Sequence, residues 1–170
     1  MNVRTIGAVA VAGLVASGAY AQTVNTDADP SAPFSSYRSY AWTPGTASPV
    51  TLTEQRIHSS VDAQMAAKGF KLATDETPDV YIATHVLTHE QPQVIANGFG
   101  PWGFGGGFGA LDVRTFVQGT LIVDMYDAKT KKMVWRGVAT ATASDKASKN
   151  TAKIDKALDK MFRHYPPSSN

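Results

Sequence analysis

Large apolar side chains alternate along two neighbouring stretches of this chain, and that alternation limits the possible folds more than any other feature. Residues 119–137 read GTLIVDMYDAKTKKMVWRG, and their large, odd-numbered apolar members are Leu121, Val123, Met125, Met133 and Trp135. Successive side chains of a strand point to opposite faces. The segment is therefore predicted to form an antiparallel hairpin whose odd-numbered residues share one buried face.

The turn of this hairpin sets its register. Asp127 is a typical first residue of a turn, and the five residues 128–132 then form the loop. In that register Asp124 lies opposite Arg136, which predicts an ion pair on the more polar face of the sheet. Exposed to solvent, such a pair contributes at most about 1 kcal/mol. Asp124 and Asp127 would face opposite ways, which disfavours a pair of catalytic carboxylates.

A first amphipathic helix is predicted to start near Thr51. The pattern Thr51-x-x-Glu54 is typical of a capping box, and Gly69 supplies the left-handed residue that often ends a helix. Three apolar residues recur at intervals of four between these ends: Ile57, Val61 and Met65. This spacing places them in one apolar stripe, with Met65 as a core residue.

A second amphipathic helix is predicted from about Asn150 to Tyr165. Ser148 or Asn150 can cap its start, and Pro166 follows its end. The apolar residues fall three or four apart and form one face: Ile154, Ala157, Leu158, Met161, Phe162 and Tyr165. Met161 is expected in the core.

Other stretches are β-prone. A short extended piece begins at Val24, large apolar residues crowd positions 34–42, and a strand is expected from Val80 to about His89, stopped by Pro92. Residues 112–127 form one long strand or two strands joined at Gly119. The sequence predicts one α+β domain over residues 22–170, in which two helices pack on one face of an antiparallel sheet of about four to six strands.

Residues 1–21 have the features of a secretory signal peptide. A short basic region with Arg4 precedes an uncharged apolar run over 6–16, and Ala19-Tyr20-Ala21 provides the small residues that signal peptidase recognises. That run rises only about 16 Å as a helix, too little for a bilayer core of about 30 Å. We expect cleavage after Ala21, which leaves Gln22 first, rather than a retained N-terminal anchor.

The chain contains no cysteine, which excludes disulfides, thiol nucleophiles, thiolate metal sites and the lipid-bearing cysteine of a lipoprotein. A soluble periplasmic protein without a lipid anchor is therefore expected. The net charge is only +2, and lysines are interspersed with aspartates. Without a field of one sign, nucleic acid is not expected as a partner.

Residues 97–110 form a loop rich in glycine and aromatic residues. Gly98, Gly100 and Gly103 spell the dinucleotide-binding pattern G-x-G-x-x-G, but Pro101 interrupts it and more glycines follow where a helix should begin. No nucleotide site is expected. The loop is either disordered or packed on itself, or it offers its rings to an envelope protein or a membrane surface. The candidate interaction tip consists of Phe99, Trp102, Phe104 and Phe108.

The histidines do not form a pattern typical of a metal site. His85 and His89 share a strand face but stand about 13 Å apart, too far to bind one ion, and nothing in the sequence brings His58 or His164 to them. No G-x-S-x-G or H-E-x-x-H pattern occurs. We therefore predict no catalytic residues, no metal and no cofactor.

Four stretches together carry a family resemblance: residues 34–42, AAKGF at 66–70, PDVYIA at 78–83 and residues 119–137. In this order they resemble the bacterial domain-of-unknown-function family 4136. Members of that family are mostly described as envelope lipoproteins, often with a glycine- and aromatic-rich stretch in the middle. The resemblance implies an envelope location and supports the fold, but it implies no activity or site residues.

The sequence thus favours an exported, non-catalytic envelope protein that acts as a binding or interaction module. A small-ligand carrier, with a pocket between the sheet and the helices, is the first alternative. An enzyme is the weaker alternative, which a polar cavity containing His85 or His89 would favour and a solid apolar core would disfavour. The ligand, the partner and the oligomeric state are not predicted.

Overall fold

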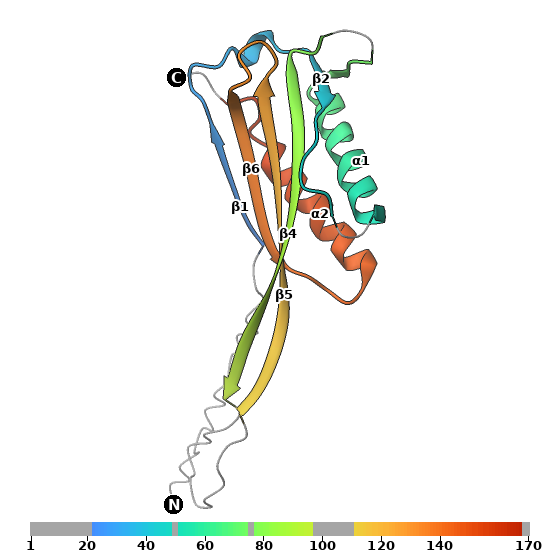
Figure 1. Ribbon diagram of the computed structural model, residues 1–170, viewed down its shortest axis with the longest axis vertical. Helices are drawn as coiled ribbons and strands as arrows, with labels where there is room; N and C mark the ends of the chain where they lie inside the picture. The colour runs from blue at the N-terminus through green and yellow to red at the C-terminus, as the bar shows by residue number, and fades with distance from the viewer. Residues whose placement is uncertain (1–21, 49–50, 75–76, 97–110, 168–170) are drawn as a thin grey trace, which may run out of the picture.

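The predicted hairpin lies at the centre of a six-stranded sheet. The structure, a computed structural model, describes residues 22–48, 51–74, 77–96 and 111–167. The elements along the chain are β1 (Thr23–Ala28), the 3-10 helix η1 (Phe34–Ser36), β2 (Ser39–Trp42), α1 (Thr51–Ala67), β3 (Lys71–Leu72), β4 (Val80–Ala96), β5 (Leu111–Asp127), β6 (Met133–Thr142) and α2 (Ala147–Phe162). The strand order across the sheet is β1-β6-β5-β4-β2-β3 (Figure 1).

The architecture is α+β, but the sheet is mixed, so the expectation of a purely antiparallel sheet is wrong. β1, β6, β5 and β4 pair antiparallel, whereas β2 pairs parallel with both β3 and β4. The chain passes through α1 between β2 and β4. A connection that contains a helix can return the chain to the end from which it started, and the second strand then runs parallel to the first.

The hairpin has the register expected from its turn, with one irregularity. Asp124 pairs with Arg136 and Met125 with Trp135, but Tyr126 then pairs with Met133. Val134 is the extra residue of this bulge, and it is buried at 4% exposure, whereas Met133 is 37% exposed. The prediction that Met133 shares the buried face is therefore wrong, because a bulge reverses the alternation beyond it.

β4 continues past Pro92 to Ala96 and pairs along its whole length with β5, so the expected stop at Pro92 is wrong. β6 pairs with β5 only from Gln118 onward, which leaves residues 90–96 and 111–117 as a two-stranded ribbon beyond the sheet (Figure 1). Proline is tolerated in such an edge position, where its missing N–H faces away from the paired strand. β5 is one continuous strand through Gly119.

Two faces of the sheet follow from this register. The core face carries Ile82, Val123 and Met125, and the opposite, polar face carries Asp124 and Arg136. The buried apolar cluster joins the core face to α1 through Ile57, Val61 and Met65, and to α2 through Ala157, Leu158, Met161 and Phe162. At one end of this core the Trp135 ring packs 5.2 Å from Phe162 and 5.6 Å from Tyr165, centroid to centroid.

The backbone of the residues that follow α1 explains why this helix ends where it does. Gly69 has φ +83°, and the amides of Gly69 and Phe70 donate to the carbonyls of Ala66 and Met65 at 2.9 and 3.0 Å. These are the two hydrogen bonds of a Schellman motif, which the left-handed glycine permits.

α2 begins and ends about three residues earlier than predicted. Asn150 is not its N-cap: it lies in the first turn, and its amide bonds to both backbone groups of Ser144 at 2.7 Å. These bonds instead tie the first turn of the helix to the chain that enters it from β6.

Candidate functional site

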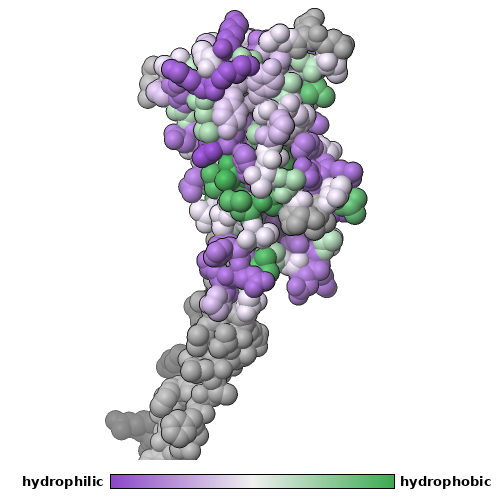
Figure 2. Space-filling view, viewed as in Figure 1, coloured by the Kyte–Doolittle hydropathy of each residue, from purple (hydrophilic) through white to green (hydrophobic). Residues whose placement is uncertain are grey.

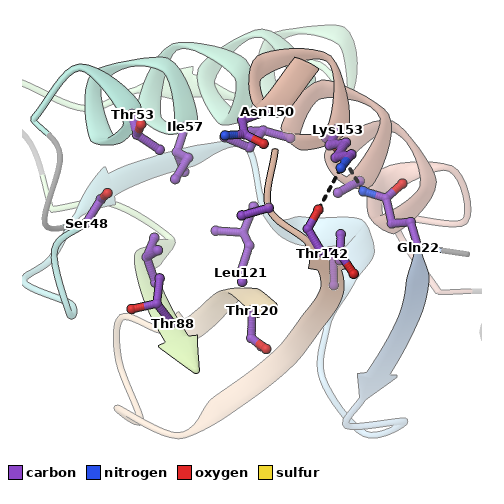
Figure 3. Close-up of a pocket in the computed structure, with 17 residues that line it drawn as sticks. Gln22, Ser48, Thr53, Ile57, Thr88, Thr120, Leu121, Thr142, Asn150 and Lys153 are labelled. Atoms are coloured by element: carbon purple, nitrogen blue, oxygen red, sulfur yellow. Dashed lines mark hydrogen bonds between the residues drawn. The ribbon is translucent and has the colours of Figure 1, made fainter. Parts of the chain in front are cut away.

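A cavity of about 270 Å³ is lined by residues of both helices and of the sheet. α1 contributes Thr53 and Ile57, α2 contributes Asn150 and Lys153, and Leu121 rises from the sheet (Figure 3). Most other lining residues are small or apolar. The cavity has the position and character of a small-molecule site, which is usually concave and mainly apolar with few polar groups.

Side-chain size along the core face explains why the cavity exists. Successive cross-strand pairs of β5 and β6 read Met125–Trp135, Val123–Gly137, Leu121–Ala139 and Gly119–Ala141. The first of these pairs is buried under α2, whereas Gly119, Ala139 and Ala141 line the cavity. Among the described residues outside its chain neighbours, a Cβ atom added at Gly119 would have only the carbonyl oxygen of Ala141 within 4 Å, at 3.9 Å. The sheet therefore lacks the atoms that would fill this end of the core.

The cavity has one charged side chain at one end. The Lys153 ammonium donates to the carbonyl oxygen of Thr142 at 2.6 Å, and the Gln22 amide donates to the carbonyl oxygen of Lys153 at 2.6 Å (Figure 3). These two bonds connect the start of β1 and the end of β6 to α2. They hold the Lys153 side chain at the end of the cavity that the Thr142 backbone borders.

The predicted ion pair on the polar face includes a buried carboxylate. Asp124 is fully buried, and Arg136 donates to it through Nε and Nη2, both at 2.7 Å. The Tyr126 hydroxyl donates to the same carboxylate at 3.3 Å. Burial and the Asp124 charge raise the pKa of Tyr126, and the bond to Asp124 raises the pKa of Arg136. The Asp124–Arg136 pair forms, but it is not the exposed pair that the sequence indicates.

His85 completes this network, and both of its ring nitrogens are engaged. The Thr46 amide donates to Nδ1 at 3.1 Å, and Nε2 lies 3.4 Å from Asp124 Oδ2. Since Nδ1 accepts a hydrogen bond, the neutral ring carries its proton on Nε2, which faces the carboxylate. A general base needs a free nitrogen directed at a substrate, and in this arrangement His85 presents none.

A shallower cleft of about 520 Å³ adjoins this network. It is lined by Thr43, Pro44, Tyr81, Ala83, His85, Tyr126 and Lys131. The Lys131 ammonium lies 4.6 Å from the centre of the Tyr81 ring, a cation–π contact. Figure 2 shows hydrophobic surface over the middle of the sheet, and Leu87 is half exposed on the same face. The cleft on the polar face is thus more open than the cavity that α1 and α2 help to line.

The predicted site residues lie in different places. His85 and His89 share the polar face of β4, His58 stacks on Trp42 at 3.9 Å, and His164 is exposed after α2. The structure therefore does not bring the four histidines together. Among the described residues no group of three or more histidines, cysteines or acids could hold a metal ion.

Several predictions concern residues outside those that the structure describes. The four aromatic residues of the predicted tip, Phe99, Trp102, Phe104 and Phe108, and the signal segment with Ala21 all belong to this group. Gln22 is described and contributes to the cavity wall. In the described part of the chain, neither helix is long and apolar enough to cross a membrane.

The predictions from the sequence do not include the residues that line the cavity. Glycine and alanine at core-facing positions 119, 139 and 141 were the available signal, since a strand that buries only small residues leaves space against a helix. In the sequence, nothing distinguishes Lys153 from the other lysines of the same stretch. Its contact with Thr142 depends on how α2 folds back over β6, which no local pattern specifies.

Residues 24–167 match the family model whose description is Domain of unknown function (DUF4136). The chain belongs to this family. The resemblance carried by its hairpin and by residues 34–42 is thereby confirmed. No curated protein matches the chain.

Solved structures resemble this DUF4136 member at low identity. A PDZ domain protein from Parabacteroides distasonis superposes with a TM-score of 0.57 at 14% identity over 88% of this chain, which spans only 37% of that protein. The PelC dodecamer from Paraburkholderia phytofirmans gives 0.50 at 14% identity, over 83% of this chain and 98% of that one. The lipoprotein GNA1162 from Neisseria meningitidis gives 0.40 at 10% identity, over 72% and 96%, too low to carry an argument. At these identities the first two similarities concern the fold alone.

Proposed function

We propose that this DUF4136 protein is an exported, non-catalytic binding protein of the cell envelope that holds a small ligand between its helices and its sheet. The cavity of about 270 Å³ beneath α1 and α2 is the observation that carries the proposal. In this account both helices cover the core face, and the small residues at the end of the sheet leave room for the ligand.

The chemistry of the polar face supports binding rather than catalysis. The one histidine beside a buried carboxylate has both nitrogens engaged, by the Thr46 amide and by Asp124. Asp124 itself forms an ion pair with Arg136. This network supports a structural role, because its hydrogen-bonding groups are directed at one another. It also weakens the enzyme alternative, although His85 lines the cleft.

The proposed location rests on the N-terminal sequence. Arg4, the apolar run over 6–16 and the small residues Ala19 and Ala21 are typical of a signal peptide cleaved before Gln22. Because the chain has no cysteine, the exported protein would not carry the lipid of a lipoprotein.

Native mass spectrometry of the protein recovered from a periplasmic extract tests both parts of the proposal. A polypeptide of residues 22–170 with an added small-molecule mass is the expected result. An uncleaved chain in the membrane fraction would contradict the location. A bare polypeptide under conditions that preserve noncovalent complexes would contradict the small-ligand function.

The ribbon favours a second candidate function, an interaction module. In the described part of the chain, residues 90–96 and 111–117 pair as strands only with each other and extend beyond the sheet, and they lead into the glycine- and aromatic-rich stretch (Figure 1). Val117 at the base of the ribbon is 39% exposed. A long two-stranded ribbon has little stability of its own, which is consistent with a role in contacting an envelope protein or a membrane surface.

Replacement of Phe99, Trp102, Phe104 and Phe108 by serine tests this second function. Loss of a cross-linked partner in periplasm, or loss of cosedimentation with lipid vesicles, is expected if the tip binds. Leu52→Ser is the control, since Leu52 is 59% exposed on α1 and lies in another element. Unchanged cross-links and unchanged vesicle binding in the fourfold variant would exclude the tip as the contact.

A further inference from the structure

The charge within the cavity wall is of one sign. None of the 17 described residues that line the cavity is acidic, and Lys153 is the cation among them. The remaining walls are formed by aliphatic side chains, small residues, hydroxyls and two amides. A mainly apolar cavity with a single cationic end favours an anionic, amphipathic ligand over a neutral or cationic one.

The Lys153 ammonium has hydrogen-bonding capacity to spare. Among the described residues it donates once, to the Thr142 carbonyl oxygen at 2.6 Å, and an ammonium has three protons to donate. Lys153 forms no ion pair with any residue that the structure describes. A carboxylate at this end of the cavity would accept the remaining protons in charge-assisted hydrogen bonds.

The volume of the cavity limits the size of the ligand. A cavity of about 150 Å³ accommodates benzene, so the present 270 Å³ suits a molecule of about ten non-hydrogen atoms. The apolar part of such a molecule would lie over Gly119, Ala139 and Ala141, where the sheet has no large side chains. A carboxylate with a chain of about seven further carbons meets both requirements.

We propose that the cavity binds a medium-chain carboxylate, with the head group at Lys153 and the aliphatic chain between Ile57 and the Gly119–Ala141 pair. The proposal rests on the small-ligand function and names the chemical class of the ligand. Octanoate is the probe, and 1-octanol and octylammonium are comparators of equal chain length that differ in charge.

Isothermal titration calorimetry with the 22–170 protein tests the ligand class. For a ligand of this size we expect octanoate to bind with a dissociation constant of about 10–100 µM. Binding of 1-octanol is expected to be at least about tenfold weaker, and octylammonium is expected not to bind, because each lacks the negative charge that Lys153 requires.

Two kinds of variant separate the head group from the chain. Lys153→Met keeps an unbranched side chain, one atom shorter, and removes its charge, so it should weaken octanoate binding about tenfold and leave 1-octanol binding unchanged. Lys156→Met is its matched control on an exposed position of α2 and should change neither. Gly119→Leu should abolish binding of both octanoate and 1-octanol, because its side chain fills the floor of the cavity. Ala141→Leu from the neighbouring strand provides a second filling variant if the first does not fold.

Each of the following outcomes would overturn the proposal. Equal binding of octanoate and 1-octanol, or an unchanged octanoate affinity in Lys153→Met, would show that charge does not select the ligand. Octanoate binding that survives both filling variants would place the site elsewhere. Failure of all three probes, with a native adduct on the recovered protein, would overturn the carboxylate class and leave the small-ligand function intact; the same failure with a bare protein would overturn both.

Discussion

The Asp124 carboxylate is removed from water, and its stability in the folded protein depends on the side chains around it. Arg136 supplies two hydrogen bonds at 2.7 Å, and His85 and Tyr126 approach the same oxygen at 3.4 and 3.3 Å. An unpaired buried carboxylate would be strongly destabilising. The network therefore joins β4, β5 and β6 on the polar face.

Asp124→Asn should destabilise the protein because it removes the charge that Arg136 faces. We expect a loss of about 2–3 kcal/mol in the free energy of unfolding, less than the loss of about 3–5 kcal/mol for a fully buried pair, since the Arg136 side chain is 43% exposed. Urea denaturation measures it. Asp159→Asn is the control, because its pair with Arg163 is 60% exposed on both sides and should change stability by less than about 0.5 kcal/mol. Equal effects would contradict the buried network.

The lowered pKa values of two other carboxyl groups, Asp79 and Asp127, predict how the stability of the protein depends on acid pH. Backbone hydrogen bonds, from Thr130 to Asp127 and from Arg38 to Asp79, are the main reason that both pKa values lie below the ordinary 3.8. A depressed folded pKa contributes stability above the unfolded value, and this contribution disappears as the pH falls through the folded value. The free energy of unfolding should therefore be steady near pH 6 and fall below about pH 4.

Asp127→Asn should weaken that acid dependence, because the side chain no longer titrates. Its stability near pH 6 should be lower than that of the unmodified protein, and the difference should shrink at pH 3. Urea denaturation at pH 6, 4 and 3 measures this. An acid dependence as steep as that of the unmodified protein would show that Asp127 does not contribute to it.

At the scale of elements, the end of α1 depends on a backbone conformation that only glycine adopts without strain. Gly69 has φ +83°, with open space where a side chain would begin. Gly69→Ala should therefore cost about 1–2 kcal/mol through the backbone alone. Gly119→Ala is the control, since its added methyl also enters open space but the strand conformation suits alanine. Thermal denaturation of the two variants compares them, and equal melting temperatures would contradict the argument.

The ribbon should exchange its amide hydrogens faster than the sheet. Residues 90–96 of β4 and their partners 111–117 of β5 have no further strand of the described chain on either side, whereas Tyr81 and Ile82 lie between β5 and β2. Local opening of a two-stranded ribbon costs little free energy. Hydrogen exchange with mass spectrometry should show protection falling steeply between residues 80–86 and 90–96. Uniform protection along β4 would contradict this description of the ribbon.

Local patterns in the sequence predict many of the helices, strands and turns. The hairpin register, the Gly69 helix end and both helices could be predicted because each depends on residues close together in the chain. The Val134 bulge, the passage of β4 through Pro92 and the parallel pairing of β2 could not. Each of these depends on which strand lies alongside, and that is decided by packing of the whole sheet.

At the scale of the molecule, the core changes character from one end to the other. Trp135, Phe162 and Tyr165 fill one end of the layer between helices and sheet, whereas glycine and alanine leave the cavity further along it. The filled end buries large aromatic side chains, and the open end provides the candidate site. The sequence offers a pocket in this layer as an alternative but does not identify its residues, because Lys153 and Gly119 line the same cavity only in the folded chain.

The most direct test of the small-ligand function compares two proteins by native mass spectrometry. The unmodified protein and Gly119→Leu are recovered from periplasm under identical conditions, after circular dichroism has shown that both are folded. We predict an added small-molecule mass on the unmodified protein and none on the variant, whose leucine occupies the cavity floor. The same added mass on both proteins would place the ligand outside the cavity, and no added mass on either would contradict ligand binding itself.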